Sequence, residues 1–132
     1  MGEEQKNHRE TKKRISIMEL NVYQKKAMAT CMPTCENISY MLLNLVGEVG
    51  EFSSKIAKGI RKGEMIITEN ALCLDSKQFT KESLERLNES LMAECGDIMW
   101  QLSGLCTVMG WDLEEVAEYN LKKLAERKKN GT

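Results

Sequence analysis

The amino-acid sequence predicts an all-α protein. Its 132 residues include one proline and only 5% aromatic residues, whereas Leu, Met, Glu and Lys are abundant. Two long segments repeat apolar residues at spacings of three and four, the period of a helix with one buried face. A chain of this length supports one core. We therefore expect one domain, a four- to five-helix bundle with antiparallel core helices.

The first helix should follow a charged start. Residues 1–17 are rich in charge and lack apolar periodicity, so we expect a disordered arm there and the folded domain in residues 18–132. Asn21 is a suitable cap for the first helix, which Pro33 should end. The charged start does not resemble a signal peptide, and no apolar run approaches the roughly 18 residues that would cross a bilayer. A cytoplasmic protein is expected.

The second helix should begin within residues 34–37 and run to about Gly59. Its buried face is carried by apolar residues at helical spacing: Ile38, Leu42, Leu45, Val49, Phe52 and Ile56. Residues 59–77 break this pattern with glycines at both Gly59 and Gly63. A short hairpin and an irregular turn both remain open for that segment.

The third and fourth helices have clear start signals. Thr80 can cap the third helix, which carries a ladder of leucines and should stop at Gly110. Asp112 followed by Glu115 is typical of a capping box, and the fourth helix should run from there towards Gly131.

The charge balance argues against some partners. The 19 basic and 20 acidic side chains leave a net charge of −1, too little to attract a nucleic-acid polymer or an anionic membrane. Five cysteines in a chain without an export signal should be reduced. Cys31 and Cys35 have no second pair and no nearby histidine, so a zinc site is not expected there.

Two carboxylate pairs stand on the expected core helices. Glu48 and Glu51, and likewise Glu94 and Asp97, are three residues apart and so share one side of a helix. Glu94 takes the core step that a leucine would otherwise fill. Because a buried, unpaired carboxylate costs several kcal/mol, Glu94 should have a cationic partner.

Antiparallel packing would bring both pairs to the same side of the helix interface. Oxygen ligands without His or Cys favour Mg²⁺ or Mn²⁺. The single histidine, His8, lies in the charged arm, which excludes histidine-based triads and di-iron motifs. The alternative is that nearby Lys55, Lys58 or Arg61 neutralises the pairs without a metal.

Several stretches together resemble the MazG-like pyrophosphohydrolases, which belong to the all-α nucleoside triphosphate pyrophosphatases. They are residues 45–52 (LVGEVGEF), 94–100 (ECGDIMW), 110–117 (GWDLEEVA) and 120–124 (NLKKL), with Arg127 beyond and Tyr23, Gln24 and Thr30 before. The resemblance covers about residues 19–131 and leaves most of 64–79 unmatched. Two positions depart from it. Gly47 stands where many relatives have a glutamate, which leaves the four metal positions unaffected. Gln101 stands where an aromatic residue is common, and this departure affects base recognition.

The resemblance implies magnesium-dependent hydrolysis of a nucleoside triphosphate between its α- and β-phosphates, giving a monophosphate and pyrophosphate. Metal ligands would be Glu48, Glu51, Glu94 and Asp97, with Glu51 or Glu48 as general base. The purpose would be nucleotide house-cleaning or pool control. A catalytically silent nucleotide- or metal-binding module and a purely structural bundle remain as alternatives.

The rest of the substrate would meet basic and aromatic side chains. Asn120, Lys123 and Arg127 share one face of the last helix and would bind phosphate, although such residues near a helix end often face water. Lys55 and Lys58 would neutralise either the carboxylates or the substrate. The base could stack on Trp100, although aromatic side chains at such positions also serve as core residues: Trp100, Trp111, Phe52 and Tyr23. The resemblance also implies a homodimer or a dimer of dimers.

Overall fold

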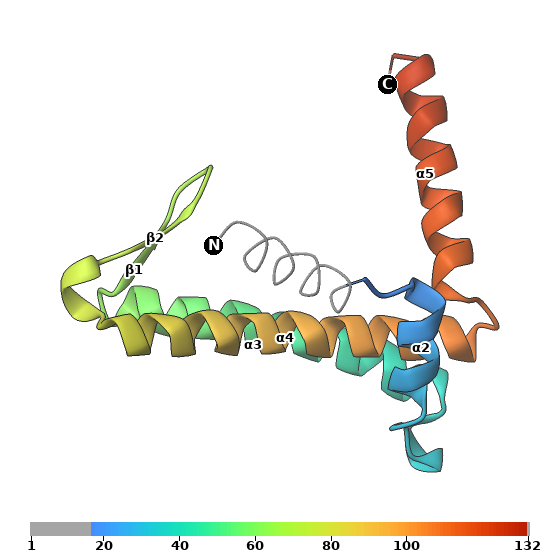
Figure 1. Ribbon diagram of the computed structural model, residues 1–132, viewed down its shortest axis with the longest axis horizontal. Helices are drawn as coiled ribbons and strands as arrows, with labels where there is room; N and C mark the ends of the chain where they lie inside the picture. Colours follow the sequence, from blue (N-terminus) through green and yellow to red (C-terminus); the bar gives the residue numbers. More distant parts are fainter. Residues whose placement is uncertain (1–16, 132) are drawn as a thin grey trace, which may run out of the picture.

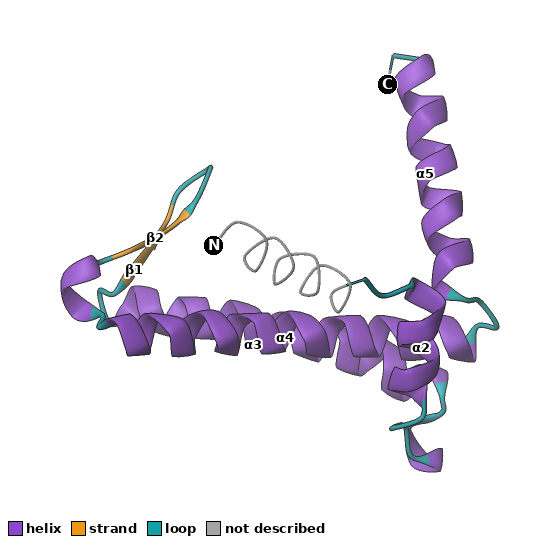
Figure 2. Ribbon diagram, in the orientation of Figure 1, coloured by secondary structure: helices purple, strands orange, loops and turns teal. Residues whose placement is uncertain are grey.

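The computed structural model describes residues 17–131 (Figure 1). The helices of this part are α2 (Leu20–Met28), α3 (Ile38–Arg61), α4 (Lys81–Val108) and α5 (Leu113–Lys129), with 3₁₀ turns at η1 (Pro33–Cys35) and η2 (Ser76–Gln78). A small hairpin, β1 (Met65–Ile67) and β2 (Leu72–Leu74), separates α3 from α4 (Figure 2). The predicted all-α class is confirmed.

Helices α3 and α4 form an antiparallel pair that runs the length of the molecule (Figure 1). They pack tightly at Gly104 of α4, where an added Cβ atom would overlap the sulfur of Met41 on α3. Met41 and Ser103 are among the most deeply buried side chains of the described residues. The antiparallel core helices predicted from the sequence are therefore present, and a glycine permits their contact.

Helix α2 is attached to this pair by polar contacts. The Gln24 side chain donates hydrogen bonds to Thr107 Oγ1 (2.9 Å) and to the carbonyl of Trp111 (3.0 Å), and accepts one from the backbone N–H of Leu113 (2.8 Å). Since Gln24 is buried, these bonds satisfy an amide that would otherwise be costly to place there. Gln24 thus joins α2 to the α4–α5 corner.

The predicted limits of the first helix were wrong at both ends. Helix α2 begins one residue before Asn21, and the Asn21 side chain instead accepts a hydrogen bond from the N–H of Glu114 at the start of α5. The helix ends at Met28, well before Pro33, because the carbonyl of Ala27 is taken by Thr30 and by the indole of Trp100. Contacts with distant segments contribute at both ends, from Glu114 at the start and from Trp100 at the end.

The other helix ends follow the sequence signals closely. Asn37 caps α3, Thr80 forms a capping box with Ser83, and Asp112 forms one with Glu115. Gly110 follows α4 with a φ of +78°, a conformation that glycine adopts without strain. Helix α3 runs past Gly59, which lies inside the helix with Met65 packed against it.

The segment between the long helices is a hairpin, one of the two forms left open by the sequence. Its strands pair antiparallel, with Met65 opposite Leu74 and Ile67 opposite Leu72. The hairpin rises from the end of the α3/α4 pair where α3 ends and α4 begins (Figure 1).

Helix α5 extends away from the α3/α4 pair (Figure 1). Every residue from 118 to 131 is exposed, including Tyr119 (74%) and Leu121 (66%). The predicted charged arm lies outside the described residues except for Ile17. Among the helices of residues 17–131, none is long and apolar enough to cross a membrane.

Candidate metal centre

Three of the predicted carboxylates meet between α3 and α4. Glu48 and Glu51 stand one turn apart on α3, and Glu94 faces them from α4. One carboxylate oxygen of each lies within 4.8 Å of the others. Because the helices run antiparallel, these residues from distant parts of the sequence converge here. The sequence predicted that all four carboxylates would converge, whereas the structure brings three of them together. The group is deep on the α4 side, where Glu94 is buried, and open on the α3 side, where Glu51 is exposed.

Glu94 has one satisfied and one unsatisfied oxygen. Glu94 as a whole residue is only 7% exposed. The Lys55 ammonium forms an ion pair with Oε1 at 2.8 Å, whereas Oε2 is buried and has no hydrogen-bond partner within residues 17–131. The predicted cationic partner of Glu94 is therefore Lys55, but it satisfies only half of the carboxylate. A buried anionic oxygen without a donor is unfavourable.

Ser90 is a site residue that the sequence reasoning missed. Its hydroxyl accepts a hydrogen bond from the Lys55 ammonium, so Ser90 and Glu94 contact the same charge. The sequence spacing could have identified it, because Ser90 lies one turn before Glu94 and so shares its helix face. Sequence reasoning treated that face only as a leucine seam interrupted by Glu94.

The surroundings of the cluster raise the pKa of Glu48. Burial raises the pKa of Glu48 above its ordinary value, and the negative charges of Asp97, Glu51 and Glu94 add to this effect. Asp97 is exposed and is not one of the three residues whose oxygens meet within 4.8 Å. Burial raises the pKa of the Tyr23 hydroxyl, and the negative charge of Asp97 adds to this effect.

The cluster fits a hard divalent cation. Within residues 17–131 it combines three carboxylates with one ammonium, which leaves net negative charge, and Glu94 keeps a buried oxygen without a hydrogen-bond partner. Oxygen ligands without imidazole or thiolate are those that Mg²⁺ and Mn²⁺ prefer. Glu48, Glu51 and Glu94 would hold the ion, with Asp97 at the edge.

The predicted substrate-binding residues are spread over three places. Lys55 lies in the cluster, and Lys58 is exposed one turn further along α3. Trp100 donates its indole N–H to Thr30 Oγ1 (2.9 Å) and to the carbonyl of Ala27 (3.1 Å), so it anchors α2. Three others lie on α5, which leads away from the cluster within one chain: Asn120, Lys123 and Arg127.

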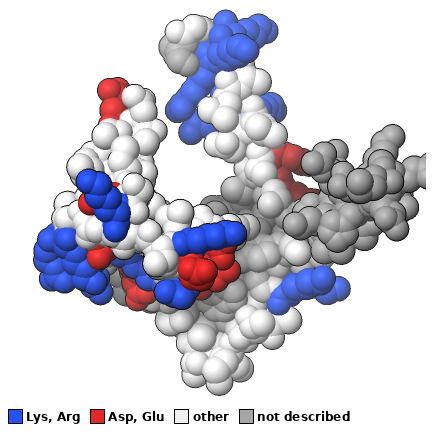
Figure 3. Space-filling view, turned by 60° about the vertical axis from the view of Figure 1, so that its left-hand side comes forward, with Lys and Arg blue, Asp and Glu red and all other residues white. Residues whose placement is uncertain are grey.

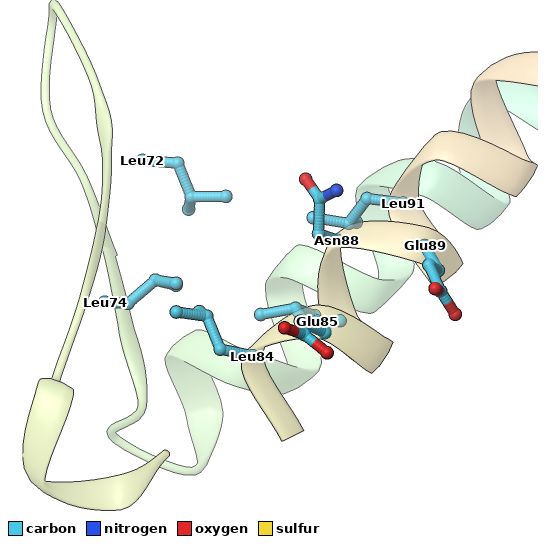
Figure 4. Close-up of a pocket in the computed structure, with 8 residues that line it drawn as sticks. Leu72, Leu74, Leu84, Glu85, Asn88, Glu89 and Leu91 are labelled. Carbon is cyan, nitrogen blue, oxygen red and sulfur yellow. The ribbon is translucent and has the colours of Figure 1, made fainter. Parts of the chain in front are cut away.

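An apolar pocket of about 520 Å³ lies between the hairpin and the first half of α4. Figure 4 shows Leu72 and Leu74 of the hairpin facing Leu84 and Leu91 across it. Leu91 is one turn from Glu94, so the pocket extends towards the carboxylates. Figure 3 shows basic side chains along α5 and at the hairpin end of the α3/α4 pair, where α3 ends with Lys58 and Arg61.

Comparison with known proteins identifies one family. A family model described as the MazG nucleotide pyrophosphohydrolase domain matches residues 36–132, which include α3, α4 and α5. The protein named "Gene 37 protein" of Mycobacterium phage L5 is 30% identical over an alignment of 121 residues, which covers 86% of this chain and 92% of the phage protein. No solved structure shows a significant match.

Proposed function

The chain belongs to the family of MazG nucleotide pyrophosphohydrolase domains, and from this premise we propose that it hydrolyses nucleoside triphosphates between the α- and β-phosphates, with Mg²⁺ or Mn²⁺ as cofactor. The products would be a nucleoside monophosphate and pyrophosphate, and the role nucleotide house-cleaning or pool control in the cytoplasm. The observation that carries the proposal is the convergence of Glu48, Glu51 and Glu94, together with the buried Oε2 of Glu94, which has no hydrogen-bond partner in the described part of the chain.

The positions of the carboxylates suggest different roles for them in holding the ion and in accepting a proton. A bound magnesium ion supplies positive charge to phosphate oxygens and acidifies a water molecule. Glu94 is held rigidly by burial between the long helices and anchors one side of the ion site, and Glu48 and Glu51 close the other side. Glu51 or Glu48 would act as general base, because a carboxylate beside the ion is within reach of the water that the ion acidifies.

The basic groups would bind the phosphate tail. Lys55 and Lys58 follow Glu51 by one and two turns on α3, so both lie near the place where phosphates would meet the ion. Asn120, Lys123 and Arg127 lie on α5, away from the cluster of their own chain. In the proposal they act in an assembly in which α5 of one subunit reaches another subunit's site.

Exposed apolar side chains support such an assembly. Leu43 (73% exposed) and Val46 (68% exposed) on α3, like Tyr119 and Leu121 on α5, leave apolar surface that monomers normally bury. We propose a homodimer or a dimer of dimers that covers these faces. The proposed catalytic activity is the same for the homodimer and for the dimer of dimers.

The direct test is a panel of ordinary and damaged nucleoside triphosphates incubated with Mg²⁺, with the products separated. Monophosphate plus pyrophosphate is expected for at least one of them, and none when EDTA replaces Mg²⁺. Diphosphate plus orthophosphate would contradict the proposed bond.

A structural bundle is the second candidate, and the Lys55–Glu94 ion pair favours it, because this pair partly neutralises Glu94 without any metal. In that case no nucleotide would be hydrolysed and Mg²⁺ would not raise the melting temperature. If the protein is the proposed enzyme, a nucleotide is hydrolysed and Mg²⁺ raises the melting temperature.

A further inference from the structure

Lys55 is placed among the groups that would hold the metal. Glu48, Glu51 and Lys55 follow one another on α3 at spacings of three and four, so their side chains share the face that meets α4. The Lys55 ammonium contacts Glu94 Oε1 at 2.8 Å and donates to Ser90 Oγ. Lys55 thus gives Glu94 a positive partner inside the α3/α4 interface.

We propose that Lys55 is an exchangeable internal cation: it holds Glu94 while the site lacks a divalent ion, and it moves to the triphosphate when the ion binds. This inference rests on the proposed function, since it requires both an ion and a triphosphate. Its consequence is that metal binding and triphosphate binding are coupled through one side chain. Lys55 is a positioning residue for the first event and a binding residue for the second.

The charges favour this exchange. A divalent ion bound by Glu94 would lie close to an ammonium on the same carboxylate, and like charges at such a distance repel strongly in a partly buried site. A triphosphate brings several negative charges to the same place. Lys55 therefore loses attraction to Glu94 when the ion binds and gains a new anionic partner when the substrate does.

The position of Lys55 permits the movement. Its side chain is 36% exposed, in contrast to the buried Glu94 side chain, which is 10% exposed. A lysine has a flexible four-carbon stem and a compact charge, so it can change partners without moving its helix. Besides Glu94, Lys55 contacts the neutral hydroxyl of Ser90, which water can replace.

The competing role for Lys55 is a permanent anchor. In that role it would keep Oε1 of Glu94 in place while the metal uses Oε2, and its loss would misorient a ligand. Loss of such a supporting partner lowers metal affinity by about 10- to 100-fold. The exchange instead predicts a higher metal affinity, because removing Lys55 removes a competitor for Glu94.

The test compares Lys55→Met, which keeps length and removes charge, with Lys62→Met, which removes the same charge at the exposed end of α3. Mn²⁺ is first titrated into each protein without nucleotide, followed by electron paramagnetic resonance. Inorganic tripolyphosphate is then titrated at saturating Mg²⁺. Lys55→Met should bind Mn²⁺ about tenfold more tightly and tripolyphosphate about tenfold more weakly than the wild type, whereas Lys62→Met should change neither by more than about twofold.

A rise in Mn²⁺ affinity together with a fall in tripolyphosphate affinity distinguishes the exchange from a purely structural role, because loss of a structural residue would weaken both affinities. Weaker Mn²⁺ binding by Lys55→Met supports the anchor and overturns the exchange, as does an unchanged affinity for either ligand. If Lys55→Met does not fold, Ser90→Ala decides, because it frees Lys55 without removing its charge: tighter Mn²⁺ binding supports the exchange and no change overturns it. Failure of the wild type itself to bind Mn²⁺ would overturn the metal site, and the role of Lys55 with it.

Discussion

The carboxylate cluster and helix α5 carry predicted site residues in opposite settings. Glu94 is buried between two long helices and is held by an ion pair. Lys123, by contrast, lies on the part of α5 where every residue is exposed and which leads away from the pair (Figure 1). One region is assembled within a single chain, whereas the other presents its side chains to the surroundings.

The difference shows how far one chain can build this site. Ligands for a small ion must be fixed to within a fraction of an ångström, so they belong on packed helices. Groups that bind a triphosphate tail can come from an element that docks later. We therefore expect substitutions in the cluster to affect metal and turnover together, and substitutions on α5 to affect substrate binding or assembly.

Glu94→Gln should have the largest effect. It keeps the shape of the side chain and removes the charge that would anchor the ion, so we expect turnover to fall by at least about a thousandfold. Circular dichroism should show an intact helical fold. Glu89→Gln, the same change at an exposed position of α4, is the control and should retain activity within about twofold. Undiminished activity of Glu94→Gln would place the metal elsewhere.

Assembly is the next comparison. Gel filtration of the wild type at micromolar concentration should give at least twice the mass of the 15.0 kDa chain. Leu121→Glu places a charge on the exposed apolar part of α5 and should shift the protein towards monomer, with a loss of activity of about a hundredfold if α5 serves another subunit's site. A monomeric wild type with full activity would refute the shared site.

Lys123→Ala should raise KM for the triphosphate by about tenfold and leave Mn²⁺ affinity unchanged, because the residue would bind phosphate and not the ion. Its neighbour Lys122 carries the same charge on another face of α5. Lys122→Ala is thus a matched control that should have little effect. Equal behaviour of the two variants would favour a solvated helix end.

The smallest effect concerns stability without metal. Because the folded state raises the pKa of Glu48, it binds the proton of Glu48 more tightly than the unfolded chain does. The resulting stabilisation is complete below the ordinary glutamate pKa and disappears as the pH rises through the raised value. In EDTA at pH 7, Glu48→Gln should therefore melt higher than the wild type, on the order of 2 °C. Melting at pH 5 should reduce the difference, and a lower melting temperature at pH 7 would contradict the repulsion.

The cluster could be predicted from the sequence, because a carboxylate in a leucine seam has few stable explanations and antiparallel packing fixes which residues it meets. Helix caps such as Thr80 and Asp112 were equally readable, since their signals are local. Asn21 was mispredicted, because its side chain caps a helix 93 residues away. The direction of α5 was not predictable either, since its exposed apolar residues do not reveal what covers them.

The claim that Glu94 anchors a divalent ion is tested most directly by titrating Mn²⁺ into the wild type and Glu94→Gln side by side, followed by electron paramagnetic resonance. We predict saturable binding to the wild type and at least a hundredfold loss of affinity in the variant. Equal binding by the two proteins would contradict the account, because the buried oxygens of Glu94 would then have no part in holding the ion.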